Sequence, residues 1–257
     1  MRFLIIFFVS IFLFNSYHLT GQYISLDSNS IKNVQISILT CNAGQDIYTT
    51  WGHTAIRVKN EQQNIDFVYN FGAFNFEDPN FLLQFLKGNL NYFLSVNYFI
   101  NFKEAYTMED RSVVEQVLNL PDTNKLFVLN KLNFYVQNPY YKYNFTDDNC
   151  TNRVANIFLS KQIIVPLIPK KNTIKTFRQG IITSTQQQGL FFTALGINIL
   201  LGYNTDKPLQ NNNFSFLPAL FMQQIAAISQ PKNLIQSTNI IVENKTIDAY
   251  SINYSFY

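Results

Sequence analysis

Hydrophobic and polar residues alternate in three stretches of the first third of the chain. Residues 34–41, VQISILTC, alternate in this way and are rich in β-branched side chains, which predicts a strand that ends at the turn residues NAGQD. The segments HTAIRV at 53–58 and IDFVYNFG at 65–72 show the same pattern around a polar segment, Lys59 to Asn64. These two segments therefore predict an antiparallel hairpin.

The pairing of this hairpin decides which side chain lies beside His53. If Val58 pairs with Ile65, His53 lies directly across from Asn70, whose amide could hold the second nitrogen of the imidazole. A slip by one residue would give His53 a different neighbour, because side chains alternate between the two faces of a sheet.

Further along the chain, the spacing of apolar residues changes between strand and helix periods. It predicts a helix at 79–87, a strand at 90–99 followed by a polar, helix-like stretch, and a short strand or the start of a helix at 111–120. Asp122 is expected to cap an amphipathic helix over 123–137, and helical spacing also predicts a helix over 216–229. The positions expected to be buried in the 123–137 helix include Leu126, Leu129, Leu132 and Tyr135.

An apolar stretch at 189–202 is too short to span a bilayer, so it predicts a core helix or a segment on a membrane surface, with core packing favoured. Residues after Gln230 show no core pattern. The 257 residues, 47% of them hydrophobic, can bury one substantial core. We therefore expect an α+β fold in which an antiparallel sheet packs against helices, with domain boundaries of 1–21, 22–230 and a tail at 231–257.

The N-terminus has the form of a secretory signal. Arg2 precedes an uninterrupted apolar run from Phe3 to Phe14, and small residues follow near Gly21. An uncleaved membrane anchor is the alternative. Export across a membrane is expected, and cleavage near Gly21 would remove His18 and leave His53 as the only histidine.

Composition excludes some classes of function. The net charge of +3 is weak, and the sequence has no Lys/Arg cluster with interleaved aromatic residues, so a nucleic-acid partner is not expected. One histidine, His53, and two cysteines without paired spacing do not complete a zinc shell, and no metal or cofactor is expected. The sequence lacks G-x-S-x-G, which argues against a serine hydrolase.

The segment from Tyr143 to Ser160, YNFTDDNCTNRVANIFLS, places a cysteine at the start of a predicted helix. Asp147, Asp148 or Asn149 could supply the capping oxygen, and the apolar residues that follow have helical spacing. Cys150 would lie in the first turn, where free backbone N–H groups and the positive end of the helix dipole stabilise a thiolate. The two aspartates would oppose this effect.

A cysteine at a helix start and a histidine on a strand, oriented by an amide, form the minimal set for thiol acyl chemistry. Cys150 would be the nucleophile, His53 the base and Asn70 the residue that orients it. Two alternatives remain open. Cys150 could be a buried thiol next to a hydrogen-bonded strand histidine, or it could form a disulfide with Cys41, as two cysteines in an exported protein often do.

Six segments, in order, resemble the motifs of the Lnb N-terminal periplasmic domain family. They are LTCNAGQDIYTTWGHTAIRV (39–58), FVYNFGAFNF (67–76), KGNLNYFLSV (87–96), EDRSVVEQVLNL (109–120), YYKYNFTDDNCTNR (140–153) and LLGYNTDKP (200–208). Each motif alone is weakly specific, but their order makes the resemblance specific. It implies a periplasmic location and a fold like circularly permuted papain-like enzymes, such as NlpC-type peptidases and lecithin:retinol acyltransferase, in which the strand histidine precedes the helix cysteine.

The activity that this resemblance implies is lipoprotein N-acylation. A phospholipid is the acyl donor, and the acceptor is the free amine of a lipoprotein's lipidated N-terminal cysteine. Cys150 of the DNC motif would be the nucleophile and His53 of the GH motif the base. Family members with that activity carry a membrane region after this domain, and none is evident in this sequence. Transfer to a membrane-bound acceptor is therefore less firmly implied than thiol acyl chemistry, and a separate membrane protein is a further partner to consider.

Two other classes of function remain open at this point. A periplasmic NlpC-type cysteine peptidase or amidase acting on cell-wall peptides would use the same Cys150 and His53, although the aromatic and aliphatic residues, with aromatic residues at 16%, favour a lipid substrate at a membrane surface. A non-catalytic lipid-binding or protein-binding module would not need the thiol. The tyrosines near Cys150 are expected to be structural.

Overall fold

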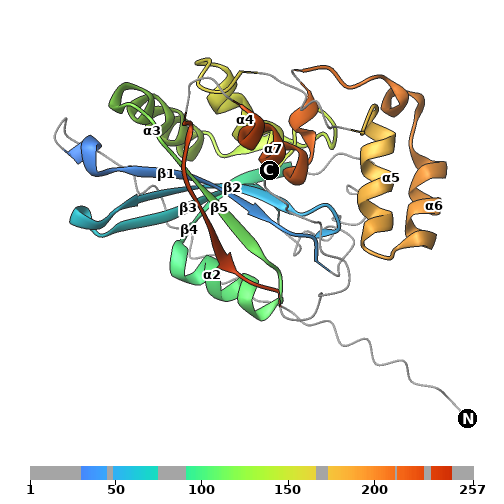
Figure 1. Cartoon of the computed structure of the whole chain (residues 1–257), viewed down its shortest axis with the longest axis horizontal. Coiled ribbons are helices and arrows are strands. Elements are labelled where there is room, and N and C mark those ends of the chain that lie inside the picture. The colour runs from blue at the N-terminus through green and yellow to red at the C-terminus, as the bar shows by residue number, and fades with distance from the viewer. Residues whose placement is uncertain are drawn as a thin grey trace, which may run out of the picture.

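A computed structural model describes residues 30–44, 49–74, 91–165, 173–211, 213–228 and 233–244. In Figure 1 a twisted sheet crosses the centre of the molecule, with helices on both faces and a helical pair at one end. The secretory signal and the helix predicted at 79–87 lie outside the described residues.

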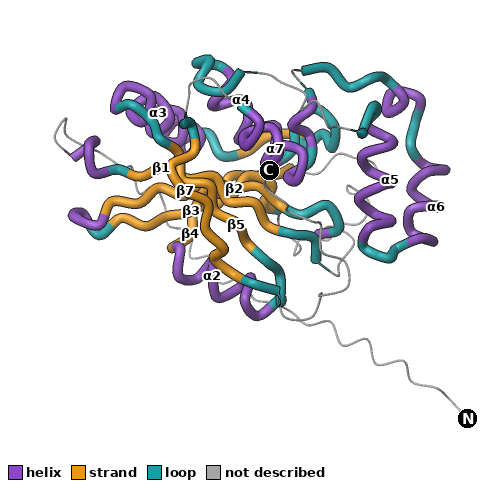
Figure 2. The backbone as a smooth tube through the Cα atoms, viewed as in Figure 1, coloured by secondary structure: helices purple, strands orange, loops and turns teal. Residues whose placement is uncertain are grey.

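The described strands form one antiparallel sheet in the order β6-β4-β3-β2-β1-β5-β7. Figure 2 shows these strands as a continuous layer. Their bounds are β1 Gln35–Cys41, β2 His53–Asn60, β3 Ile65–Ala73, β4 Asn91–Tyr98, β5 Val113–Leu118, β6 Tyr140–Lys142 and β7 Ile235–Val242. The strands predicted at 34–41, 53–58, 65–72 and 90–99 are confirmed, and the ambiguous segment at 111–120 forms a strand.

The edge strand β7 follows Gln230, where no core pattern was evident. It pairs with β5, from Val113 with Val242 to Leu118 with Ile235. Most of its side chains are exposed, and Val242 is its buried residue. The strand is thus held mainly by backbone hydrogen bonds to β5, which leave little trace in a hydrophobic pattern.

The β2–β3 hairpin is confirmed, but its register differs by two residues from the one assumed. Asn60, not Val58, pairs with Ile65, and Val58 pairs with Phe67. The turn is shorter than expected because Asn60 caps a short 3-10 helix, η3 at Glu61–Gln63, and Asn64 closes it with a left-handed φ of 55°. A shift of two residues keeps every side chain on its expected face, so only the position along the strand changes.

Helices cover both faces of the sheet. Figure 1 shows α2 on one face and α3, α4 and α7 on the other, with α5 and α6 at one end. The fold is therefore α+β with an antiparallel sheet, as predicted. The bounds are α2 Phe99–Met108, α3 Asp122–Gln137, α4 Cys150–Leu159, α5 Phe177–Gln187, α6 Phe191–Leu200 and α7 Pro218–Ala227.

The main hydrophobic core lies between the sheet and the layer formed by α3, α4 and α7. It joins Ile36, Ile56 and Tyr69 of the sheet to residues such as Leu132 and Phe158 of the helices. A smaller core on the other face packs α2 against the sheet. Because α4 packs in the main core, the position of its first residue, Cys150, is fixed relative to β2 and β3.

Two details of the predicted helices are wrong. Asp122 is the first residue of α3, not its cap, and forms an ion pair with Lys125. Leu126 was expected to be buried but is 48% exposed, while Val128 takes a buried position. The predicted positions follow a three-residue spacing, whereas an α-helix repeats every 3.6 residues, so the predicted stripe drifts away from the buried face.

Core packing was favoured for the apolar segment at 189–202, and this expectation is also wrong. Only Ala194 of α6 is buried, whereas Phe192 is 91% and Ile199 76% exposed. The helix rests on α5 and presents most of its large apolar side chains to solvent. Among the described residues, no helix has both the length and the apolar character needed to cross a membrane.

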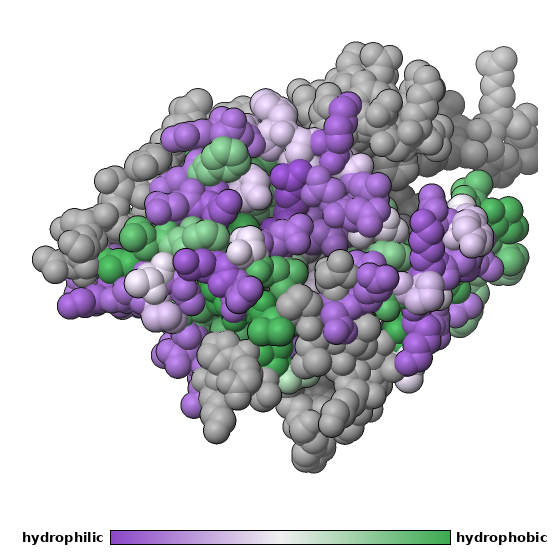
Figure 3. All heavy atoms as spheres, turned by 90° about the horizontal axis from the view of Figure 1, so that it is seen from above, coloured by the Kyte–Doolittle hydropathy of each residue, from purple (hydrophilic) through white to green (hydrophobic). Residues whose placement is uncertain are grey.

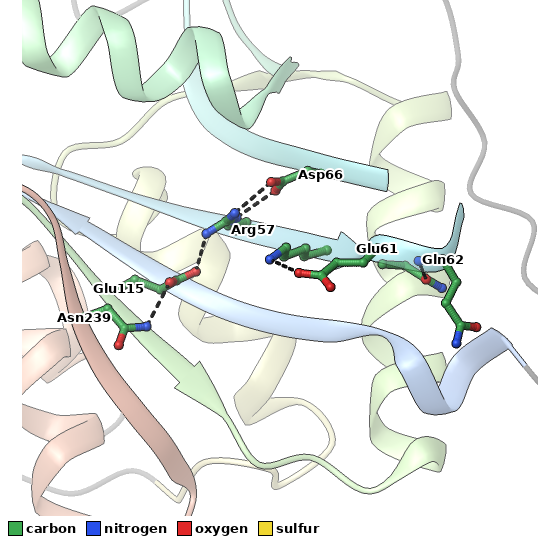
Figure 4. A network of polar contacts seen from close by, with 8 residues as sticks. Arg57, Glu61, Gln62, Asp66, Glu115 and Asn239 are labelled. Carbon is green, nitrogen blue, oxygen red and sulfur yellow. Dashed lines mark hydrogen bonds and ion pairs between the residues drawn. The ribbon is translucent and has the colours of Figure 1, made fainter. Parts of the chain in front are cut away.

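A buried ion network ties four strands of the sheet together. Arg57 of β2 donates hydrogen bonds to both oxygens of Asp66 on β3, at 2.7 Å each, and to Glu115 of β5 at 3.0 Å. Figure 4 shows Asn239 of β7 reaching the other oxygen of Glu115. The Arg57 guanidinium also lies 3.3 Å from the centre of the Phe99 ring. Because removing one partner would leave a buried charge unpaired, this network fixes the relative positions of the strands.

Candidate active site

The site begins at the N-terminus of α4. Asn149 is the N-cap, and its side chain accepts a hydrogen bond from the N–H of Asn152 at 2.9 Å, while the backbone N–H of Asn149 donates one to Oδ1 of Asn152. This capping box confirms that the helix begins at Cys150, with Asn149 as the capping residue. The cap occupies the N–H of Asn152 and not those of Cys150 and Thr151, so the first turn keeps the partial positive charge of a helix start.

The carboxylate closest to the cysteine in sequence is held by an arginine. Both oxygens of Asp148 accept hydrogen bonds from Arg153, at 2.6 Å each. Asp147 accepts one from the hydroxyl of Thr146. The expected opposition of Asp148 to a thiolate is therefore offset by the neighbouring guanidinium, one turn into the same helix.

His53 follows a glycine that no other residue could replace without strain. Gly52 has a φ of 81°, and a Cβ at this position would lie 2.5 Å from the carbonyl oxygen of Cys41. This close approach lets the chain turn from a loop directly into β2, where Cys41 and His53 are paired. The Gly-His pair thus places the histidine at the first residue of the strand.

The expected contact between His53 and Asn70 is present. The Nε2 atom of His53 lies 3.3 Å from Oδ1 of Asn70. In the observed register the contact is diagonal, not directly across the strands. Asn70 is therefore beside the imidazole as predicted from the sequence, although the strand pairing used for that prediction was wrong.

A chain of amides fixes which nitrogen of His53 carries the proton. Nδ2 of Asn70 donates hydrogen bonds to Oδ1 of Asn97, at 3.0 Å, and to the carbonyl oxygen of Val68. Ser95 also donates to Oδ1 of Asn97. With its NH₂ group used in this way, Asn70 accepts through Oδ1, which assigns the proton to Nε2 of His53 and leaves Nδ1 as a base. Asn97 and Ser95 were missed, although their alternation in β4 could have indicated two polar residues on one strand face.

The surroundings of Cys150 favour its thiolate. Burial alone raises the pKa of this thiol, but the charge and hydrogen bond of His53, with hydrogen bonds from the Thr54 backbone and the Thr151 hydroxyl, lower the pKa below its ordinary value. Thr151 lies 3.8 Å from the sulfur and is itself 3.1 Å from the hydroxyl of Thr54. The structure therefore brings Cys150 and His53 together as an interacting pair.

The other cysteine is in the opposite state. Cys41 is fully buried, and this burial raises the pKa of its thiol to about 12. Both cysteines are free, so the alternative of a disulfide between them is wrong. Cys41 lies in the small core against α2, and its burial outweighs the lowering of its pKa by Tyr106 and Arg111, so the thiol is not activated.

We expect iodoacetamide to label Cys150 much faster than Cys41 at pH 7. The thiolate is the reacting form, so the labelling rate rises with pH as the thiol ionises. Because the pKa of Cys150 is lowered, this rise should occur at a lower pH than for a free cysteine, whose pKa is about 8.5. Peptide mass mapping of the folded protein at several pH values measures both rates, with Cys150→Ser as the control for background labelling. Faster labelling of Cys41 would contradict the assignment of Cys150 as the reactive thiol.

Three tyrosines from β4 and the segment before α4 lie near Cys150. Tyr92 and Tyr143 stack with ring centres 4.2 Å apart, and the ring centre of Tyr141 lies 6.4 Å from that of Tyr92. Burial, and then the nearby charge of Cys150, raise the pKa of all three tyrosines, that of Tyr92 to about 12. Tyr141 and Cys150 both border Gly72, and Tyr92 contacts the rings of both Tyr141 and Tyr143, so these side chains belong to the surroundings of the site.

An apolar cavity of about 180 Å³ lies between the segment before α4 and the pair α5 and α6. Trp51, two residues before His53, and Phe145, five before Cys150, contact each other edge to face at 4.6 Å and form part of its wall. Ile181, Ile197 and Leu201 line the other side. No group of three or more potential metal-ligating side chains occurs in the described ranges.

Comparison with known proteins identifies one family. Residues 22–180, more than half of the chain, match the family described as the Lnb N-terminal periplasmic domain. The match includes His53, Asn70, Tyr141 and Cys150, and it confirms the resemblance found in the sequence motifs. No curated protein and no solved structure matches the chain.

Proposed function

We propose that this chain, which belongs to the family of the Lnb N-terminal periplasmic domain, transfers acyl groups from lipids through a thioester on Cys150. The acceptor would be an amine, as in lipoprotein N-acylation. The family is one of periplasmic domains, which supports a periplasmic location and gives access to phospholipid and lipoproteins on that side of the membrane.

One observation carries this proposal. Cys150 starts a helix, has a lowered pKa, and interacts with a histidine whose far nitrogen is held by Asn70. A nucleophile, a base and a residue that orients the base are the parts that covalent acyl transfer requires. A buried structural thiol would instead resemble Cys41, whose pKa is raised.

The order of these parts fits a circularly permuted papain-like enzyme. The histidine lies on β2, and the cysteine follows much later, at the start of α4. The antiparallel sheet against which α4 packs agrees with such an arrangement. We propose this fold relationship on the order and placement of the two residues.

The apolar surroundings support a lipid substrate. Hydrophobic side chains gather at the end of the molecule formed by α5 and α6 (Figure 3). The large exposed apolar residues of α6 are Phe191, Phe192, Leu195, Ile199 and Leu200. Ile197 of the same helix lines the cavity with Trp51 and Phe145, so an acyl chain entering from a membrane surface could bury methylene groups there, each contributing about 0.8 kcal/mol.

The reaction would proceed in two steps. Nδ1 of His53 takes the proton of the Cys150 thiol, and the sulfur attacks the ester carbonyl of the donor. The carbon–oxygen bond of the ester then breaks, and the leaving alcohol takes the proton from His53, which leaves a thioester on Cys150. An acceptor amine attacks this thioester with its proton passing to His53, the amide forms, and the thiol is restored. A separate membrane protein that presents the acceptor is part of the proposal.

A comparison of two donors tests the substrate class. The purified protein is incubated with phosphatidylethanolamine and phosphatidylglycerol vesicles or with muropeptides, and lysophospholipid, fatty acid and cleaved peptide are measured by mass spectrometry. We expect release of lysophospholipid, and vesicle binding that persists at high salt because apolar burial is not screened. Cleavage of muropeptides without release of any lipid product would favour a peptidase with the same Cys150 and His53.

A further inference from the structure

The hydroxyl of Tyr141 is buried beside the nucleophile and has no use in holding the fold. Its Oη atom is inaccessible to solvent and has no hydrogen-bond partner among the side chains and backbone that the structure describes. Leaving a buried polar group unpaired costs stability, so such a group calls for a functional reason.

The position of this hydroxyl relative to Cys150 is set by β3. Gly72 has a φ of 93°, in a part of β3 where the pairing with β4 shifts register between Asn70 and Ala73. A Cβ at Gly72 would lie 3.6 Å from Cβ of Cys150 and 3.9 Å from Oη of Tyr141. Cys150 and the Tyr141 hydroxyl therefore both border Gly72, where the absence of a side chain leaves space next to them.

The ring of Tyr141 is held in place from the other side. The guanidinium of Arg153 lies 3.7 Å from the ring centre, and Arg153 is itself fixed by its two hydrogen bonds to Asp148. Because Arg153 is three residues after Cys150, it lies on the same face of α4 as the nucleophile. Strand β6 supplies the backbone support, since Tyr141 pairs with Tyr92 of β4. The hydroxyl is thus preorganised without being hydrogen-bonded.

We propose that the Tyr141 hydroxyl donates a hydrogen bond to the oxyanion that forms when Cys150 attacks an ester. In this step the sulfur–carbon bond forms and the electron pair of the carbonyl bond moves to its oxygen. Tyr141 keeps its proton and only donates a hydrogen bond, and the thiol proton stays on His53 until the leaving alcohol takes it. Oη therefore gains a hydrogen-bond partner only during the reaction. An interaction that is made only in the transition state lowers the reaction barrier, whereas one made equally with the substrate only strengthens binding.

The chemistry of the hydroxyl agrees with this role. Burial, and then the nearby Cys150, raise the pKa of Tyr141 well above the ordinary value, and the opposing effect of Arg153 is smaller. The hydroxyl accordingly stays protonated across the neutral range and can only act as a hydrogen-bond donor to a developing negative charge.

A pair of matched variants tests the assignment. Tyr141→Phe removes this hydroxyl, and Tyr69→Phe removes another buried hydroxyl without a hydrogen-bond partner. Burial raises the pKa of Tyr69 without any contribution from Cys150, so this residue is a control outside the site. Each protein is reacted with p-nitrophenyl acetate, a small ester that needs no lipid site, and separately with iodoacetamide, which alkylates the same sulfur without forming an oxyanion.

We expect Tyr141→Phe to slow acetylation of Cys150 on the order of 10²- to 10³-fold, with the rate of alkylation unchanged. Tyr69→Phe should change neither rate, and thermal unfolding of both variants should remain cooperative because only an unpaired hydroxyl is lost. An equal loss in both reactions would mean that Tyr141 acts on the thiolate, and unchanged acetylation would mean that it has no part. Either result overturns the proposal.

This inference rests on the proposed thiol acyl chemistry, and the two can fail separately. If the wild-type protein is acetylated on Cys150 and Tyr141→Phe is slow, but phospholipid gives no product, then the lipid substrate is wrong and the role of Tyr141 stands. If p-nitrophenyl acetate does not acylate Cys150 of the wild type, both proposals are wrong.

Discussion

Replacing Cys150 by serine is expected to abolish acyl transfer while the protein stays folded. The environment that lowers the pKa of the thiol cannot bring a serine hydroxyl near ionisation at neutral pH. Loss of the covalent nucleophile of a catalytic triad lowers kcat on the order of 10⁶-fold, and we expect a loss of that order here. Lysophospholipid release by Cys150→Ser is the measurement.

The matched control for this variant is Cys41→Ser. Cys41 is buried in the core against α2, and we expect its replacement to reduce the thermal unfolding temperature but to leave the activity of the folded protein in place. If Cys150→Ser retains turnover while folded, the nucleophile is wrongly assigned. The same conclusion would follow if Cys41→Ser, measured below its unfolding temperature, lost all turnover.

Replacing His53 by alanine is expected to remove nearly all turnover as well. The variant loses the base that takes the thiol proton, which costs on the order of 10²- to 10⁴-fold. It also loses the group that contributes most to lowering the pKa of Cys150, so the pH at which alkylation of the thiol rises should move upward. The rate of acyl-enzyme formation and the pH profile of alkylation are the two measurements.

Asn70→Ala should cost less than His53→Ala, because the amide only fixes the tautomer and the angle of the imidazole. Asn97→Ala should have a smaller effect of the same kind, since Asn97 acts only through Asn70. A folded His53→Ala variant that forms acyl-enzyme at the wild-type rate would remove His53 from the mechanism. A loss on Asn70→Ala as large as that of His53→Ala would give the amide a greater role than orientation.

The sequence predicted the central site because its signals are local. Capping residues before Cys150 and helical spacing after it mark the start of α4, and strand alternation places His53 and Asn70 on neighbouring strands. The prediction of a contact between His53 and Asn70 held although the assumed register was wrong by two residues, because a two-residue shift keeps both side chains on the same face.

The features that sequence analysis missed depend on contacts between distant segments. The strand β7 is mostly exposed and held by pairing with β5, so it lacks the apolar alternation of a buried strand. The apolar residues of α6 predict burial, but the helix packs mainly on α5 and keeps most of them exposed. Tyr141 becomes part of the site only because β6 pairs with β4 and Arg153 packs on its ring.

The intact mass of the protein after mixing with phospholipid vesicles shows directly whether Cys150 carries an acyl group. We expect one acyl adduct on the wild-type protein, which peptide mapping places on Cys150 and which hydroxylamine removes as it does a thioester. We expect no adduct on Cys150→Ser and an unchanged adduct on Cys41→Ser. Two results would contradict a Cys150 thioester: release of lysophospholipid by the wild type without a Cys150 adduct when the acceptor amine is withheld, or an adduct on another residue.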